Sequence, residues 1–182
     1  MGRIVEELLL LARLDEGLPL RREPVEVELV VEEALLRGLR LPAAGPGRGA
    51  DPGGAAGPGA RRARVDAEPG LFALADPDRL LQVVSNLVVN AVQHAGDEAG
   101  FTIATRRGDD EVAIEVSDTG PGIRPEDLPH VFDRFYRGTS RGGAGLGLAI
   151  ADSLTRAMAG RLAVRSTVGE GTAFTVHLPA AD

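Results

Sequence analysis

Two asparagines four residues apart are the first residues of this chain that suggest chemistry. Asn86 and Asn90 lie in the middle of an otherwise apolar segment whose spacing predicts a helix over residues 78–93. Asparagine is unfavourable inside a helix, and neither residue is placed to cap this one. Because positions i and i+4 share one helical face, the two amides can act together as oxygen ligands of Mg²⁺ and as partners of phosphate oxygens. The alternative is that they satisfy buried groups of neighbouring loops.

A carboxylate at the end of a predicted strand offers a second kind of chemistry. Asp118 opens a glycine turn that continues through Gly120, Gly122 and Ile123. A buried carboxylate at this point can accept a hydrogen bond from the exocyclic amine of adenine, whereas guanine would face it with a carbonyl oxygen. Because an unpaired buried polar group costs roughly 1–3 kcal/mol, Asp118 would favour ATP over GTP. The alternative is an ordinary turn residue.

A second glycine turn leads into another predicted helix and suits phosphate. Helix N-termini bind anions through free N–H groups and the helix dipole, and glycines let the backbone approach a ligand closely. The residues concerned are Gly143, Gly145, Leu146, Gly147 and Leu148. Just before this turn, Arg137 and Arg141 either contact a terminal phosphate from a lid or are solvated surface charges. Thr172, after a Gly-x-Gly turn, is either a nucleotide contact or a plain strand residue.

The composition narrows the class of protein. The 182 residues allow one good-sized core, and 43% hydrophobic residues is ordinary for a soluble domain. A net charge of -7 argues against nucleic-acid binding, and the absence of cysteine excludes disulfides and thiolate chemistry. All 20 basic residues are arginine. A P-loop and a protein-kinase fold each need a lysine on the phosphates, so both are excluded.

The elements that must position these residues follow from hydrophobic periodicity and turn residues. Helical spacing predicts helices over 4–14, 25–40, 78–93 and 146–158, with a short helix near 126–132. Alternation predicts strands over 62–67, 71–75, 101–107, 111–117, 161–166 and 172–178. The Gly/Pro-rich stretch 42–60 has almost nothing to bury, so we expect a flexible loop there. The order predicts the α+β class: an α/β sandwich with a mixed, mostly antiparallel sheet covered on one face by helices.

The N-terminal helix has an apolar stripe that is wide for a lone surface helix. The stripe consists of Ile4, Val5, Leu8, Leu9, Leu11, Ala12 and Leu14, and Gly17 and Pro19 end the helix. We interpret it as the end of a longer packed helix. An ordinary amphipathic N-terminal helix is the alternative.

Five segments together resemble the motif boxes of bacterial sensor histidine kinases. Residues 86–91 are similar to the N box, 118–123 to the G1 box, 132–137 to the F box, 143–148 to the G2 box and 169–172 to the last glycine motif. Their order and spacing match over 24–179, and the set is far more specific than any single box. The opening segment 8–15 is similar to the end of the family's second dimerisation helix.

This resemblance implies the Bergerat ATP-binding fold, with a mobile lid over about 133–145. It implies adenine held by Asp118 and Mg²⁺ held chiefly by Asn90, with Asn86 beside it. The other nucleotide-contacting positions that it implies are Gln93, His94, Gly120, Gly122, Ile123, Tyr136, Gly143, Gly145, Leu146, Gly147, Leu148 and Thr172, with Arg137 and Arg141 near the γ-phosphate. It divides the chain into the end of the dimerisation and phosphoacceptor helix, residues 1–19, and a catalytic ATP-binding domain, residues 20–182.

The implied reaction needs partners outside this chain. With ATP and Mg²⁺ as cofactors, the γ-phosphate passes to a histidine of the dimerisation domain and then to a response-regulator aspartate in two-component signalling. The phosphoacceptor box is missing, and His94, His130 and His177 lack its context. We therefore expect a monomeric, cytoplasmic fragment that binds ATP without autophosphorylating and contacts neither nucleic acid nor membrane. The implied parent is a homodimer anchored in the cell membrane.

Other functions stay open at this point. Hydrolytic relatives with the same fold, such as the gyrase B, MutL and heat-shock chaperone ATPases, use a glutamate where this chain has Asn86, which cannot act as a base. An anti-sigma serine kinase should lack the F box and the helical tail. A non-catalytic docking module is supported by Gln93, where the family often has a basic residue, and by the missing acceptor. The stretch 42–60 is also longer than the family's usual connection.

Overall fold

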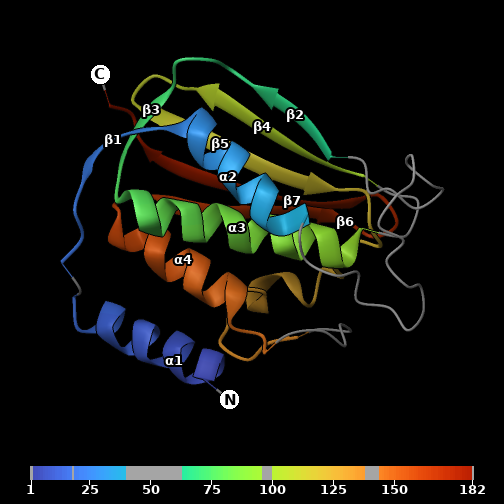
Figure 1. Cartoon of the computed structure of the whole chain (residues 1–182). Coiled ribbons are helices and arrows are strands. Elements are labelled where there is room, and N and C mark those ends of the chain that lie inside the picture. Colours follow the sequence, from blue (N-terminus) through green and yellow to red (C-terminus); the bar gives the residue numbers. More distant parts are fainter. Residues whose placement is uncertain (1, 18, 40–62, 96–99, 138–143, 182) are drawn as a thin grey trace, which may run out of the picture.

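A five-stranded sheet with helices on one face forms the frame of the protein (Figure 1). The computed structural model describes residues 2–17, 19–39, 63–95, 100–137 and 144–181. In chain order the elements are α1 (Gly2–Asp15), β1 (Glu23–Glu26), α2 (Val27–Leu39), β2 (Ala63–Ala67), β3 (Phe72–Ala75), α3 (Pro77–His94), β4 (Phe101–Arg107), β5 (Glu111–Asp118), η1 (Leu128–His130), α4 (Gly147–Ala157), β6 (Arg161–Thr167) and β7 (Gly171–Pro179). The predicted loop 42–60 lies outside the described residues.

The sheet is mixed and mostly antiparallel, as predicted. Its strand order is β2-β4-β5-β7-β6, in which β2 runs parallel to β4 and the other neighbours are antiparallel. The two predicted hairpins, β4–β5 and β6–β7, are joined through the pairing of β5 with β7. A separate antiparallel pair consists of β1 and β3. The pairing of β5 with β7 brings the end of β5 beside the start of β7.

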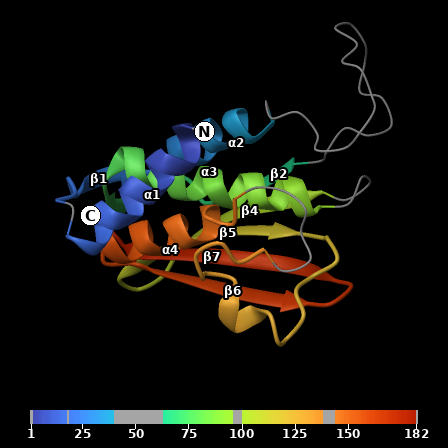
Figure 2. The ribbon, with the colours of Figure 1, turned by 90° about the horizontal axis from the view of Figure 1, so that it is seen from below.

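The helices form a layer on one face of this sheet (Figure 2). α3 contacts β5, and α4 contacts β6 and β7, so these two helices cover the sheet. α2 packs on α3, and α1 packs on α4. The apolar core between the layers includes Leu87, Ile114, Leu154 and Phe174. This arrangement confirms the predicted α+β sandwich. None of the described helices combines the length and apolarity needed to cross a bilayer.

α3 carries the two asparagines, and its sequence explains its start and its orientation. Asp76 caps the helix by accepting a hydrogen bond from the Arg79 N–H at 3.2 Å, and Pro77 occupies the first turn. The apolar residues recur with helical spacing and are buried: Leu80, Val83, Val84, Leu87, Val88, Ala91 and Val92. Because that face is fixed against the core, Asn86 and Asn90 lie at its edge.

Two predicted helices differ from the structure. The second helix begins at Val27 instead of Val25, because residues 23–26 form β1 and pair with β3, a strand far along the chain. Local periodicity contains no signal for such a pairing. The short helix near 126–132 is only the 3₁₀ turn η1. There the His130 N–H bonds to the Asp127 carbonyl at 3.0 Å, and Pro129 has no N–H with which to continue a ladder.

α1 is docked by one part of its apolar stripe. Leu11 is fully buried against the core. At the end of the helix, Asp15 accepts a hydrogen bond from Arg134 Nη2 at 2.6 Å. The stripe residues that stay exposed are Ile4, Val5, Leu8, Leu9 and Ala12. The stripe is therefore wider than the surface that it covers here.

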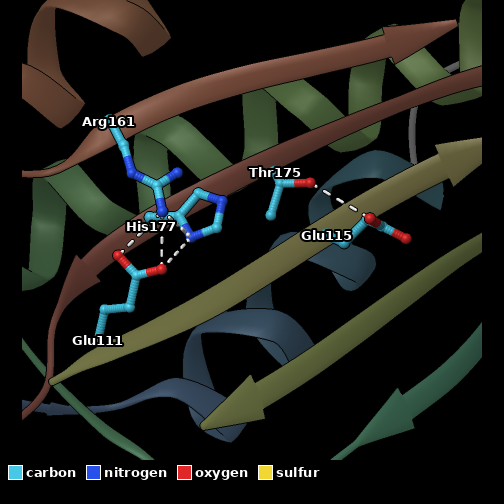
Figure 3. A network of polar contacts seen from close by, with 5 residues as sticks. All are labelled: Glu111, Glu115, Arg161, Thr175 and His177. Atoms are coloured by element: carbon cyan, nitrogen blue, oxygen red, sulfur yellow. Dashed lines mark hydrogen bonds and ion pairs between the residues drawn. The ribbon is translucent and has the colours of Figure 1, made fainter. Parts of the chain in front are cut away.

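The other face of the sheet carries polar side chains (Figure 3). Glu111 of β5 accepts a hydrogen bond from Arg161 Nη2 of β6 at 2.8 Å, and His177 Nδ1 of β7 lies 2.7 Å from the same carboxylate. Glu115 of β5 accepts from the Thr175 hydroxyl of β7 at 3.2 Å. Such cross-strand pairs are typical of an antiparallel sheet with one face in water. His177 is thus half-buried on this face of the sheet, with 18% of its side chain exposed.

Candidate functional site

A cavity of about 390 Å³ opens at the end of the sheet where β5 finishes. Its walls are α3, the turn after β5, and the segments on either side of the start of α4. The residues predicted from the sequence that line it are Asn86, Asn90, Gln93, His94, Asp118, Gly122, Ile123, Tyr136, Arg137, Gly145, Leu146, Gly147, Leu148 and Thr172. Gly120 packs behind the lining against His94, and Arg141 and Gly143 lie outside the described residues. One concavity therefore unites motifs spread over residues 86–172.

The two amides of α3 have different surroundings. Asn86 Nδ2 donates a hydrogen bond to the Gly147 carbonyl at 3.0 Å, so this side chain joins α3 to the first turn of α4. Asn90 lies one turn further along the same face and also lines the cavity. The NH₂ group of Asn86 thus satisfies a backbone carbonyl of a neighbouring segment, which was the alternative interpretation of this residue. Its carbonyl oxygen is not used in that bond, so both asparagines still offer an amide oxygen at the cavity wall.

The start of α4 has no side-chain cap. Leu146 occupies the N-cap position, and no described side chain accepts a hydrogen bond from the first turn as a cap. The first backbone bond of the helix joins the Ile150 N–H to the Leu146 carbonyl at 2.9 Å. The N–H groups of Gly147, Leu148 and Ala149 therefore have no partner within the helix. Because Gly147 and Leu148 line the cavity, this helix end can bind an anion there.

Asp118 is a buried carboxylate in the cavity wall, with 6% of its surface exposed. Its Oδ1 accepts a hydrogen bond from the Gly120 N–H at 2.8 Å, which orients the carboxylate. Burial raises the pKa of Asp118 above its ordinary value, and the Gly120 N–H and the nearby His94 oppose that rise. The other carboxylate oxygen can accept a hydrogen bond from the amine of a ligand.

The β5–β7 register places Thr172 directly opposite Asp118. The Ser166 hydroxyl of β6 donates to the Gly171 carbonyl at 2.8 Å and accepts from the Ile123 N–H at 2.8 Å. Thr172 Oγ1 lies 2.9 Å from Ser166 Oγ. Since Ser166 has one hydroxyl proton, already donated, Thr172 is the donor in that contact. The Thr172 oxygen keeps its acceptor capacity, and the turn after Asp118 is held against the β6–β7 hairpin.

The protein's own backbone requires glycine at positions 122 and 145, which the sequence indicated as contacts of a ligand. Gly122 has φ +72°, and a Cβ there would lie 2.2 Å from the Thr167 carbonyl oxygen. Gly145 has φ +71°, and a Cβ there would lie 2.7 Å from the carbonyl carbon of Phe135. Both distances are far below van der Waals contact. Glycine is therefore needed at these positions to close the walls of the cavity, whether or not a ligand is bound.

Tyr136 and Arg137 enter the cavity wall after an unusual backbone turn. Phe135 has φ +65°, which is rare for a bulky residue. Its N–H donates to the Gly145 carbonyl at 2.9 Å, so the segment before the undescribed residues 138–143 is bonded to the segment after them. This bond is a tertiary contact, and it holds Tyr136 and Arg137 in the cavity wall.

Three charged residues of the cavity wall were not predicted from the sequence, namely Glu7, Arg124 and Asp127. Glu7 comes from α1, whose docking against α4 has no local signal in the sequence. Arg124 and Asp127 directly follow the Gly122 turn, and that proximity was the available signal. Apolar lining residues that were also missed are Val89, Pro121, Val131, Ala144, Val168 and Phe174.

We expect Gly122→Ala to lower the free energy of unfolding by at least about 2 kcal/mol, since it combines a strained φ with a backbone clash. Gly169→Ala is the matched control, because Gly169 has a similar φ of +84° but nothing within 4 Å of the added Cβ. It should cost about 1 kcal/mol. Urea denaturation of the two variants measures both values. Equal losses would show that the contact with Thr167 is not what requires glycine.

Comparison with known proteins shows the family of this chain. Residues 75–182, more than half of the chain, match the family described as histidine kinase-, DNA gyrase B-, and HSP90-like ATPase. The chain is 39% identical over 183 residues to the probable sensor histidine kinase TcrY of Mycobacterium tuberculosis, covering 97% of this chain and 35% of TcrY. It therefore spans about a third of the length of that relative.

Solved structures agree as well. Full-length ShkA in complex with AMPPNP matches with a TM-score of 0.78 and 30% identity, over 98% of this chain and 35% of that chain. The mycobacterial sensor histidine kinase MprB matches with a TM-score of 0.72 and 26% identity, over 87% of this chain and 98% of that chain. The chain thus belongs to the histidine kinase-, DNA gyrase B- and HSP90-like ATPase family, and its relatives there are sensor histidine kinases.

Proposed function

We propose that this chain is the ATP-binding catalytic part of a sensor histidine kinase, which binds Mg-ATP and presents the γ-phosphate to a histidine of a dimerisation domain outside the chain. One observation carries the proposal. The amides of α3, the uncapped start of α4 and the buried Asp118 all line a single cavity. Each of these groups matches a different part of Mg-ATP.

The adenine end of the cavity is the wall of Asp118 and Thr172. A carboxylate oxygen of Asp118 accepts a hydrogen bond from the exocyclic amine, and the Gly120 N–H holds the carboxylate in place. Guanine would bring a carbonyl oxygen against the same acceptor. The Thr172 hydroxyl, directed by Ser166, adds a polar group beside Asp118.

The phosphate end lies between α3 and the start of α4. The free N–H groups of Gly147 and Leu148 bind phosphate oxygens, and Arg137 lines the same cavity as a candidate partner of the γ-phosphate. Gln93 and His94 line the cavity from the last turn of α3.

The donor set suits Mg²⁺ bound together with the nucleotide. Asn90, with the Asn86 carbonyl oxygen beside it, supplies neutral oxygen ligands. Within the described residues no cluster of three His, Cys, Asp or Glu side chains could hold a metal by itself. Mg²⁺ needs no such cluster, because it often takes one or two protein groups together with phosphate oxygens and water. When bound, it neutralises charge on the phosphates and so assists phosphoryl transfer.

The geometry does not favour a hydrolytic function. A water-activating base would be expected at position 86, and Asn86 cannot accept a proton. Its NH₂ group is also committed to the Gly147 carbonyl. The phosphoryl acceptor is therefore expected to come from another domain, because the groups described here bind and position the nucleotide without activating an acceptor.

The proposed partners are the dimerisation domain and a response regulator, and the proposed parent is a membrane-anchored homodimer that phosphorylates a histidine and then an aspartate. We propose that residues 1–19 are the end of the dimerisation helix and 20–182 the catalytic domain. The exposed stripe of α1, with Ile4, Val5 and Leu8, supports this division, since apolar residues left over on a docked helix favour further helical partners. Transfer of phosphate from ATP to an added dimerisation-domain fragment tests the whole proposal.

We expect Mg-ATP to bind this chain with a dissociation constant between micromolar and millimolar values, and GTP to bind about ten- to hundredfold more weakly. Asp118→Asn should reduce this preference, since an amide can turn either its acceptor or its donor toward the base. Isothermal titration calorimetry with both nucleotides measures the ratio. The same affinity for ATP and GTP in the unmodified chain would remove the role assigned to Asp118.

Asn90→Ala should weaken ATP binding in the presence of Mg²⁺ and have little effect when the metal is chelated, because the lost group is a metal ligand. A loss of about tenfold corresponds to one hydrogen-bond or ligand contact of roughly 1.4 kcal/mol. Titrations with magnesium and with EDTA separate the two cases. An affinity that is unchanged in both, or reduced equally in both, contradicts the assignment.

The contribution of Asp118 to ATP affinity should also depend on pH. Because burial raises the pKa of Asp118, this carboxyl takes up its proton at a higher pH than an ordinary aspartate does. Protonation removes the charged acceptor, so the ATP affinity of the unmodified chain, relative to Asp118→Asn, should fall as the pH drops through the raised pKa. The ratio of the two affinities cancels the titration of the nucleotide itself. A ratio that stays constant until an ordinary aspartate would be protonated excludes this role.

A further inference from the structure

Asp127 is a carboxylate in a cavity proposed to bind a polyphosphate, which is an unexpected location for a negative charge. Its side chain lines the cavity and is 16% exposed. Oδ1 accepts a hydrogen bond from the Tyr136 hydroxyl at 2.5 Å, and Oδ2 accepts from Arg124 Nε at 2.8 Å. Both oxygens therefore accept hydrogen bonds from protein groups, so neither needs a ligand as its partner.

The two partners also keep Asp127 charged. The hydrogen bond from Tyr136, and next the one from Arg124, lower the pKa of Asp127 below its ordinary value. Arg124 places a positive charge against the carboxylate, which reduces its repulsion of nearby phosphates. Asp127 is thus held as an anion whose field is largely compensated. This arrangement suits a side chain that anchors a neighbour, and it does not suit a ligand of the nucleotide.

The neighbour that it anchors is the segment Phe135–Arg137. The Tyr136 ring packs near His130 with ring centroids 5.8 Å apart. The backbone N–H of Tyr136 donates to the Asp133 carbonyl at 3.2 Å. On its other side the segment is bonded through the Phe135 N–H to the Gly145 carbonyl at 2.9 Å. The Tyr136 hydroxyl bond to Asp127 is the side-chain contact that completes this clamp.

We propose that Asp127, supported by Arg124, is a positioning residue for the γ-phosphate: it fixes Tyr136 and thereby holds Arg137, the next residue, at the phosphate end of the cavity. The inference rests on the proposed function and adds a residue to it. A side chain that acts only through Arg137 affects recognition of the third phosphate. It leaves binding of adenine and of the first two phosphates nearly unchanged.

The test compares Mg-ATP with Mg-ADP in isothermal titration calorimetry. Asp127→Ala, which removes the acceptor of the Tyr136 hydroxyl, should weaken Mg-ATP about tenfold, the equivalent of one charge-assisted hydrogen bond, and Mg-ADP less than about twofold. Tyr136→Phe should give the same selective loss. In the double variant the loss should be no larger than in either single variant, because both substitutions break one contact.

Glu126→Gln is the matched control. Glu126 adjoins Asp127 and pairs with the same arginine at 3.4 Å, but its side chain is 65% exposed and lies outside the cavity lining. The substitution removes one negative charge, as the substitution of Asp127 does, but it leaves the hydrogen bond of Tyr136 intact. The ratio of ATP to ADP affinity should therefore not change. Thermal unfolding of each variant reports whether its fold is intact.

Equal loss of ATP and ADP binding in Asp127→Ala and Tyr136→Phe would reduce Asp127 to a structural residue and overturn the proposal. So would unchanged affinity for both nucleotides. A change of the ratio in Glu126→Gln would show that charge, and not the bond to Tyr136, is responsible, and would overturn it as well. If the unmodified chain bound neither nucleotide, the proposed function itself would fail, which is a different result from any of these.

Discussion

The burial of one face of α3 is the constraint on which the rest of the site depends. Leu80 and Leu87 are fully buried between this helix and its neighbours, and burial of each such side chain is worth about 1.5–3 kcal/mol. The helix therefore cannot rotate without a large loss of stability. With that face fixed, Asn86 and Asn90 lie on the cavity side, and the bond from Asn86 to Gly147 sets the start of α4 against them. The proposed metal ligands and the helix end proposed to bind phosphate are positioned by the same packing.

The pairing of β5 with β7 has the corresponding role at the other end of the cavity. It places Asp118 opposite Thr172, and Ser166 of the adjacent strand bonds to the turn that follows Asp118. A slip of one residue in this pairing would turn every side chain of the strand to the other face of the sheet. The alternating buried residues of β5, such as Ile114 and Val116, oppose such a slip. Core packing thus determines the register, and the register determines the site.

The charges of the cavity are consistent with an anionic ligand once their partners are considered. Neutral amides, not carboxylates, face the proposed metal and phosphates. Asp118 lies at the opposite end, where a base amine would donate to it. Asp127 is compensated by Arg124 and Tyr136. Asp118 therefore has a proposed function, and Asp127 has partners that limit its repulsion of phosphate.

The sequence by itself determined the class of fold, the helix that carries the amides and most of the residues in the cavity wall, because periodicity, caps and glycine turns are local signals. It placed the start of the second helix wrongly, since β1 exists only by pairing with the distant β3. It also missed Arg124, Asp127 and Glu7 as cavity residues. Only the tertiary structure decided that Thr172 faces Asp118 and that Asn86 binds the start of α4. Those relations join residues that are far apart in the chain, and no local pattern encodes them.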